Sequence, residues 1–297
     1  MLEMLLGVGG KGVGIRKASL PNRRAVIADT IAGKLYVFGG SGPSGDILGD
    51  LLCYTPETDS WETKASGPPS RYNHVAGVVN GKLYIHGGYN GALGGVLKDT
   101  WCYDPTDNTW VQKTSAPAGR SGAGGVGSGT RLVVLGGNVA GNWDKTIWAY
   151  RANNNDWVQL APFPGVARQN PSLAAIGDKV YCYSGFDSTG ARINDFWQYD
   201  VTLNTWVQFA PSPAGGRYLH KAFTFNNKMY VHGGWSAAGP TGELLCYDPA
   251  GNSWTKSATD QKMYDHFAVP INSKLYLGGG YLSTGELTGN MWELELV

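Results

Sequence analysis

Five arginines recur at one position of a repeated pattern and are the first candidates for binding chemistry. Each lies sixteen residues before a Gly-Gly pair, or before Ser-Gly in one copy, and they are Arg23, Arg71, Arg120, Arg168 and Arg217. A guanidinium group offers paired donors to a carboxylate or phosphate, and several that converge would attract an anion. The same groups could instead bind carbonyl oxygens at strand ends within the fold, and the sequence leaves both interpretations open.

A second set follows the Gly-Gly pairs directly. In chain order it contains Ser41, Tyr89, Asn138, Phe186, Trp235 and Tyr281. Aromatic side chains beside arginines are typical of the residues that dominate binding energy at interfaces. If the repeated units are related by rotation, each set forms a ring, and the two rings predict a ligand-binding face.

Histidines and acids could support other chemistry. His74, His220 and His266 lie three residues after the arginine position or its Met263 substitute, and His86 and His232 precede Gly-Gly pairs. We expect these histidines to be structural, and the sequence contains no Cys-x-x-Cys, His-Glu-x-x-His or acidic calcium-loop pattern that would indicate a metal. No cofactor is predicted.

Two further expectations concern polar residues at these positions. If the protein were an enzyme, His74, His220 or Tyr281 would be the acid–base candidates, with an arginine holding an anion. Short polar residues before the third strand of each unit should bond to local backbone groups. They are Asp50, Asp99, Asp195 and Asn290.

The elements that carry these residues are short strands. Successive glycine pairs are 46 to 49 residues apart, and each ends an apolar run such as KLYVF or KMYVH. A Tyr followed seven residues later by a Trp marks five copies, as in Tyr103 and Trp110. Four strands per copy result, and because one small sheet cannot bury both faces, the copies must stack. Radial stacking produces a propeller.

The ends of the chain complement each other. The last copy stops after its third strand, and residues 15–19 (IRKAS) resemble the fourth-strand segment WETKAS at 61–66. The sequence therefore predicts one domain over 1–297 whose last blade is completed by an N-terminal strand, with residues 1–12 as a flexible lead-in. Gly7–Gly12 matches G-x-G-x-x-G, but neither strand nor helix flanks it, so no dinucleotide site is expected.

The combined pattern, Arg…KLY-Gly-Gly…Trp-x-Tyr-Asp-Pro-x-x-Asn-x-Trp, resembles that of kelch repeats over roughly residues 13–297. The resemblance implies an all-β fold, a six-bladed kelch-type β-propeller. In kelch adaptor domains, residues at both ring positions reach the ligand face and grip acidic peptides. The resemblance thus favours a non-catalytic scaffold that binds a protein or peptide partner at the channel mouth, with an acidic partner as one option. The alternative is a small enzyme, or a protein that binds a sugar or carboxylate in the same pocket.

The composition of the chain indicates which kinds of partner and which cellular compartment to expect. The formal net charge is +1 with no basic run, which argues against nucleic acid, and no apolar stretch reaches the 18 residues of a membrane span. Three of four cysteines, Cys53, Cys102 and Cys246, occupy equivalent positions in different copies, too far apart for disulfides. Free thiols predict a cytoplasmic protein, and we expect a monomer.

Overall fold

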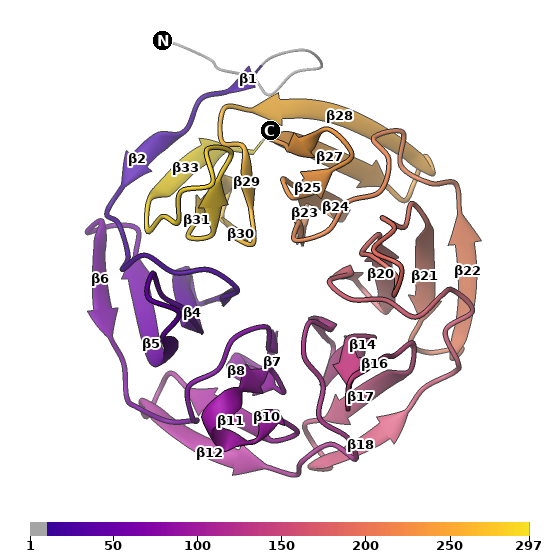
Figure 1. The fold of residues 1–297 in the computed structure, drawn as a ribbon, viewed down its shortest axis with the longest axis horizontal. Helices are drawn as coiled ribbons and strands as arrows, with labels where there is room; N and C mark the ends of the chain where they lie inside the picture. The colour runs from indigo at the N-terminus through magenta and orange to yellow at the C-terminus, as the bar shows by residue number, and fades with distance from the viewer. Residues whose placement is uncertain (1–10, 297) are drawn as a thin grey trace.

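Six β-sheets surround a central axis like blades in the computed structural model, which describes residues 11–296 (Figure 1). Each blade has its first strand innermost and antiparallel neighbours outward. The first two blades contain β3 (Ile27–Ile31), β4 (Lys34–Ser41), β5 (Ile47–Thr55) and β6 (Ser60–Thr63), then β7 (Val75–Val79), β8 (Lys82–His86), β11 (Thr100–Asp104) and β12 (Thr109–Lys113). The next two contain β13 (Gly124–Ser128), β14 (Arg131–Leu135), β17 (Ile147–Arg151) and β18 (Asp156–Gln159), then β19 (Ser172–Ile176), β20 (Lys179–Tyr183), β21 (Phe196–Asp200) and β22 (Thr205–Phe209). The last two contain β23 (Lys221–Phe225), β24 (Lys228–His232), β27 (Glu243–Asp248) and β28 (Ser253–Thr259), then β30 (Phe267–Ile271), β31 (Lys274–Gly278) and β33 (Met291–Glu295).

The N-terminal segment closes the ring. β2 (Ile15–Lys17) pairs antiparallel with β33, and the Leu20 amide donates to Gly289 O at 2.9 Å. The prediction that an N-terminal strand completes the last blade is confirmed. Most of the predicted lead-in lies outside the described residues, but its last two residues form β1 (Lys11–Gly12), which pairs parallel with β28. These two residues are therefore not part of a flexible lead-in.

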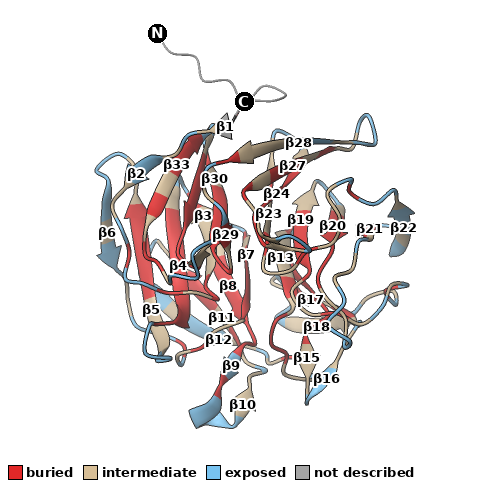
Figure 2. Ribbon diagram, turned by 45° about the horizontal axis from the view of Figure 1, so that its top comes forward, coloured by how far each residue is buried: buried red, intermediate tan, exposed pale blue. Residues whose placement is uncertain are grey.

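Short ribbons project from the end of the propeller where the glycine pairs lie. Four are two-stranded: β9 (Tyr89–Asn90) with β10 (Gly95–Val96), β15 (Asn138–Val139) with β16 (Asn142–Trp143), β25 (Trp235–Ser236) with β26 (Gly239–Pro240), and β29 (Met263–Tyr264) with β32 (Tyr281–Leu282). A 3-10 helix, η1 (Gly91–Leu93), lies between β9 and β10. Most residues of these ribbons are half-buried, whereas the strands beneath them are largely buried (Figure 2). No helix of residues 11–296 is long and apolar enough to cross a membrane.

The hydrophobic core lies between the blades. Buried side chains form six clusters, one for each pair of neighbouring blades. Between the first and last blades, Val37 and Tyr54 pack with Phe267 and Tyr276, so the ring is sealed where the two ends of the chain meet. The alternating apolar residues of each strand thus serve two interfaces, one on each face of the blade.

The Tyr–Trp landmark also links neighbouring blades. The Tyr103 hydroxyl donates to Asn108 Oδ1 at 2.8 Å, and Asn108 has a φ of 52° in the turn. The Trp110 indole donates to Ala65 O of the preceding blade at 3.1 Å, while Asn108 Oδ1 accepts the Ala65 amide at 3.0 Å. The seven-residue spacing therefore sets a hairpin turn and an attachment to the previous blade.

Glycine pairs are required where each second strand meets the next blade. Gly87 and Gly88 have φ values of 67° and 96°, and a Cβ on Gly87 would lie 2.4 Å from Arg120 O. Ser184, which replaces the first glycine in one copy, has a φ of 59°, and its hydroxyl donates to Arg217 O at 2.7 Å. A hydrogen bond across the blade boundary compensates for the unfavourable backbone conformation there.

Candidate functional site: an aromatic rim at the channel mouth

The five recurrent arginines lie inside the protein. Arg71 is 0 % exposed, and its two terminal nitrogens donate to the two oxygens of Asp99, both at 2.7 Å. The same guanidinium also donates to Gly87 O at 3.0 Å and to Pro69 O at 3.0 Å. Equivalent pairs join Arg23 to Asp50, Arg168 to Asp195 and Arg217 to Glu243, while Arg120 reaches Asp144 and Thr146.

This arrangement removes the five arginines from the candidate ligand contacts. Each of them is at most 4 % exposed, and each guanidinium group already forms an ion pair with an acidic side chain of the fold. The five are Arg23, Arg71, Arg120, Arg168 and Arg217. The alternative interpretation, in which they tie strand ends together, fits the geometry.

The expectation for the short polar residues was wrong in all four cases. Asp50, Asp99 and Asp195 bind these arginines rather than only local backbone. In the last blade, Met263 is buried in place of the arginine, and Asn290 accepts a hydrogen bond from Arg16.

Some of the residues that directly follow the Gly-Gly pairs do reach the surface. Each member pairs with the residue that follows the arginine position, as in the bridges Tyr72–Tyr89 and Tyr218–Trp235 and the pair Tyr264–Tyr281. We call the resulting ring of side chains the aromatic rim: Tyr72, Tyr89, Trp143, Phe186, Tyr218, Trp235, Tyr264 and Tyr281. Sequence analysis missed Tyr72, Trp143, Tyr218 and Tyr264. For three of these, the position directly after the arginine landmark was the available signal.

Ring contacts join the members of the aromatic rim into three separate groups. Ring centroids are 4.6 Å apart for Trp143 and Phe186, and 5.0 Å apart for Phe186 and Tyr218. A second run joins Trp235 to Tyr264 at 4.9 Å and Tyr264 to Tyr281 at 5.1 Å. These side chains are half-buried, so their faces are fixed by their neighbours while part of each ring meets solvent. Tyr72 and Tyr89 form a third pair, 5.6 Å apart.

Two arginines at the mouth remain accessible. The Arg24 guanidinium lies 5.7 Å from the Tyr281 ring centroid and 3.4 Å from an oxygen of Asp265. Arg192 lies 5.5 Å from the Tyr218 ring, and its Nε donates to Trp235 O at 3.3 Å. Burial raises the pKa of Asp265, opposed by the nearby positive charges of Lys221 and Arg24. The rim therefore combines aromatic faces with two positioned cations.

Two members of the predicted set have other roles. Ser41 is buried and does not reach the mouth. The Asn138 side chain accepts the Gly141 amide at 3.0 Å and shapes the β15–β16 turn. The aromatic members Tyr89, Phe186, Trp235 and Tyr281 are the ones that the structure places in the rim.

The histidines lie beneath this surface. His74 and His220 are 1 % and 2 % exposed, and neither ring has a hydrogen-bond partner among the described residues. Burial, followed by the charge of Arg217, lowers the pKa of His220 to about 3. His232 Nδ1 and His266 Nε2 lie 2.9 Å apart and share one hydrogen bond. Within residues 11–296, no group of three His, Cys, Asp or Glu side chains could hold a metal ion.

Comparison with known families agrees with this architecture. The KLHDC2/KLHL20/DRC7 Kelch-repeats domain matches residues 15–170 and 164–297. The chain belongs to the kelch-repeat family. This kelch propeller therefore uses the recurrent features of its repeats, the arginine, the glycine pair and the Tyr–Trp landmark, in internal contacts, and its rim residues vary from copy to copy.

Curated relatives match over a short segment. N-acetylneuraminate epimerases of Escherichia coli (strain K12) and Shigella flexneri are each 40% identical to this chain over 65 residues. The match covers 20% of this chain and 18% of each epimerase. N-acetylneuraminate epimerase 2 of Escherichia coli O6:H1 (strain CFT073) matches to the same extent. The kelch propeller thus aligns with about a fifth of the length of these relatives.

Proposed function

We propose that this kelch propeller is a binding module whose aromatic rim takes a protein or peptide partner with acidic side chains. The observation that carries the proposal is the aromatic surface at one mouth, with Arg24 and Arg192 held against its rings. Tyrosine, tryptophan and arginine are the residues most enriched among those that dominate interface energy. The kelch family, whose propellers generally bind proteins, supports the same class of function.

The form of the rim supports a peptide more than a small molecule at this position. Its members come from four short ribbons and their neighbouring loops, and they extend around the mouth. An extended chain could contact several ribbons at once. Aromatic rings contribute large contact areas at low entropic cost, because contacts with neighbouring rings already restrict them.

The proposed partner is acidic because of the exposed charges. Within residues 11–296, no acidic side chain lies within salt-bridge distance of Arg192, so its positive charge is available to a ligand. Arg24 is paired with Asp265, and a carboxylate of the partner would give the Arg24 guanidinium group a second acceptor. Because such contacts are partly exposed, they would steer association and weaken as salt is raised.

The catalytic alternative has less support at this mouth. The acid–base candidates His74 and His220 lie under the surface, and burial lowers the pKa of both. The match to the epimerases covers too little of either chain to extend their activity to this propeller. We further propose a reducing compartment such as the cytoplasm, since all four cysteines are free.

Selection from a random peptide library would test the proposal. We expect peptides enriched in Asp and Glu to bind the wild type and to lose at least tenfold in affinity with Tyr264→Ala/Tyr281→Ala or Arg24→Ala/Arg192→Ala. Matched controls are Phe225→Ala and Arg131→Ala, which flank hairpin turns at the opposite mouth. Enrichment of no peptide, or equal loss in the controls, would overturn the proposal.

A further inference from the structure

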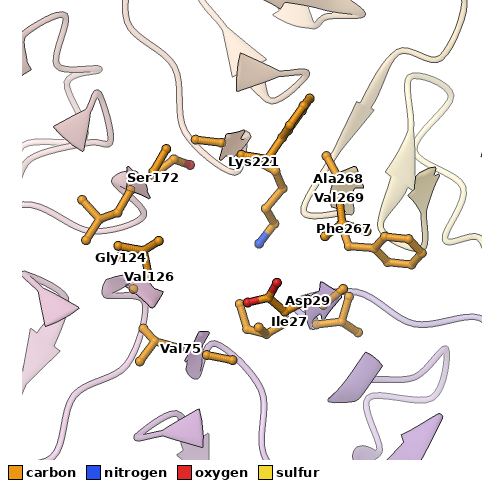
Figure 3. Close-up of a pocket in the computed structure, with 18 of the residues that line it drawn as sticks. Ile27, Asp29, Val75, Gly124, Val126, Ser172, Lys221, Phe267, Ala268 and Val269 are labelled. Atoms are coloured by element: carbon orange, nitrogen blue, oxygen red, sulfur yellow. The ribbon is translucent and has the colours of Figure 1, made fainter. Parts of the chain in front are cut away.

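The central channel holds two charged side chains that the aromatic rim does not use. Figure 3 shows Lys221 of β23 reaching into the channel, and Asp29 of β3, on the next blade but one around the ring, faces the same space. All six inner strands line this cavity, which has a volume of about 330 Å³. That volume is at the lower end of the roughly 300–1,000 Å³ found for small-molecule pockets. It suits a small metabolite rather than a folded partner.

Small residues let the inner strands pack closely around the channel and leave its lining with short side chains. Gly124, Gly125 and Gly127 of β13 face the neighbouring inner strands, and a Cβ on Gly127 would lie 2.1 Å from Val78 O. Further alanines line the same cavity: Ala28, Ala76, Ala174, Ala175, Ala222 and Ala268. Long side chains are few in this lining, so the length and charge of Lys221 distinguish it from its neighbours.

The Lys221 ammonium group is without a direct partner. It makes no hydrogen bond and has no acidic oxygen within 4 Å in the described part of the chain. Burial lowers the pKa of Lys221, and only the more distant charge of Asp265 opposes this effect. Lys221 is half-buried in the channel wall, so its ammonium group lacks a counterion and part of its hydration, and an anionic ligand would compensate for both.

Asp29 is fixed in place within the channel wall. Its two oxygens accept the backbone amides of Thr30 at 2.8 Å and Val78 at 3.0 Å. Burial raises the pKa of Asp29 to about 6 in spite of these bonds. A carboxyl group has about four acceptor positions, so it can still receive a hydrogen bond from a group in the channel.

The channel walls offer further hydrogen bonds. β3, β7, β13, β19, β23 and β30 are all edge strands of their sheets, and the free edge of each faces the channel. Edge strands present unpaired N–H and C=O groups. A few of these are satisfied by side chains, as where the Thr224 hydroxyl donates to Ala175 O at 2.8 Å. Hydroxyl groups suit such walls because each can donate and accept.

We propose that the channel binds a small hydroxy acid, with its carboxylate on Lys221 and its hydroxyl groups on Asp29 and the inner-strand edges. The carboxylate supplies the missing counterion, and the hydroxyls match a lining that contains both donors and acceptors. Other charged or titratable groups near this site include Asp265, Arg24, His74, His220 and His266. The proposal is independent of peptide binding at the aromatic rim.

NMR titration of ¹³C-lysine-labelled protein with gluconate tests this assignment. The Lys221 resonance is identified by its absence from the spectrum of Lys221→Met. We expect gluconate to shift it in a saturable manner and to raise the Lys221 pKa toward its ordinary value, because a bound anion favours the charged ammonium. Acetate, which lacks hydroxyls, should bind at least tenfold more weakly, and ethylene glycol should cause no shift.

Calorimetry with matched variants completes the test. Lys221→Met removes a half-buried charge and should fold, and we expect it to lose at least tenfold in gluconate affinity. Lys228→Met, at an accessible lysine of the same blade that pairs with Asp248, should bind like the wild type. Tyr264→Ala/Tyr281→Ala should also bind gluconate normally, which separates this site from the rim. No saturable shift of Lys221, or equal affinity in Lys221→Met, would overturn the proposal.

Discussion

Replacement of Arg71 by methionine should lower the free energy of unfolding of this propeller. The sequence alone makes this arginine a candidate ligand contact. Arg71 is 0 % exposed and makes two bonds to Asp99 and two to backbone carbonyls. Removing one partner of a buried ion pair costs about 3–5 kcal/mol. We expect a loss near the lower limit, about 3 kcal/mol, because Asp99 remains 18% exposed and can regain water.

The last blade supplies the comparison that makes this prediction specific. It has Met263 and Asn290 where other copies have arginine and an acid, and Met263 is fully buried. The double variant Arg71→Met/Asp99→Asn should therefore be less destabilised than either single variant. Because the two residues are in contact, their effects should not add, and the coupling free energy should exceed about 1 kcal/mol.

Urea unfolding followed by tryptophan fluorescence would measure these free energies. Arg131→Met is the control, since it removes an arginine without a buried ion pair, and it should change stability by less than about 0.5 kcal/mol. The reasoning would be refuted if Arg71→Met unfolded within about 1 kcal/mol of the wild type and lost peptide binding. That result would return the arginine ring to the ligand contacts.

Three further predictions concern the interior. Burial lowers the pKa of His86, His220 and His232 to about 3, so the unfolded state binds more protons between about pH 3 and 6.5. The contribution of these histidines to the free energy of unfolding should therefore be complete above that window and fall with acidification by roughly 1.4 kcal/mol per pH unit for each histidine. His220→Gln should reduce the pH dependence of the unfolding free energy measured with urea. An unchanged pH dependence would contradict the burial argument. Burial raises the pKa of Cys182 to about 12, so Ellman's reagent should modify this thiol only at the rate of unfolding, and rapid native-state labelling would count against it. A Cβ on Gly289 would lie 1.8 Å from Leu20 O, so Gly289→Ala should separate the N-terminal strand from the last blade and expose Lys17 to trypsin. The control Ser283→Ala should not. Equal resistance of the two variants to trypsin would contradict this prediction.

The repeated positions of the sequence predict the fold correctly but only some of the residues of the candidate site. Spacing between glycine pairs, the Tyr–Trp landmark and the incomplete last copy each depend on local backbone geometry, which recurs in every blade. The same recurrence misled the site prediction, because a residue that every copy needs is a residue that the fold itself uses. Arg71 and its equivalents are paired within their own blades for this reason.

The missed residues follow from contacts that the sequence does not display. Tyr218 and Tyr264 directly follow the arginine landmark or its substitute, but only the bridges to Trp235 and Tyr281 show that this position lies at the mouth. Lys221 and Asp29 are about two hundred residues apart and occupy different positions in their strands, so no repeat pattern relates them. Ring closure alone brings them to one channel (Figure 3).

Hydrogen–deuterium exchange with a selected acidic peptide tests the central claim, that the aromatic rim is the binding face, most directly. We predict slower exchange in β25–β26, β29–β32 and the loop that carries Arg192 when the peptide is bound. The hairpin turns at the opposite mouth, such as Asn80–Gly81 and Asn226–Asn227, should exchange as in the free protein. Protection confined to those turns, with the rim unchanged, would contradict the account.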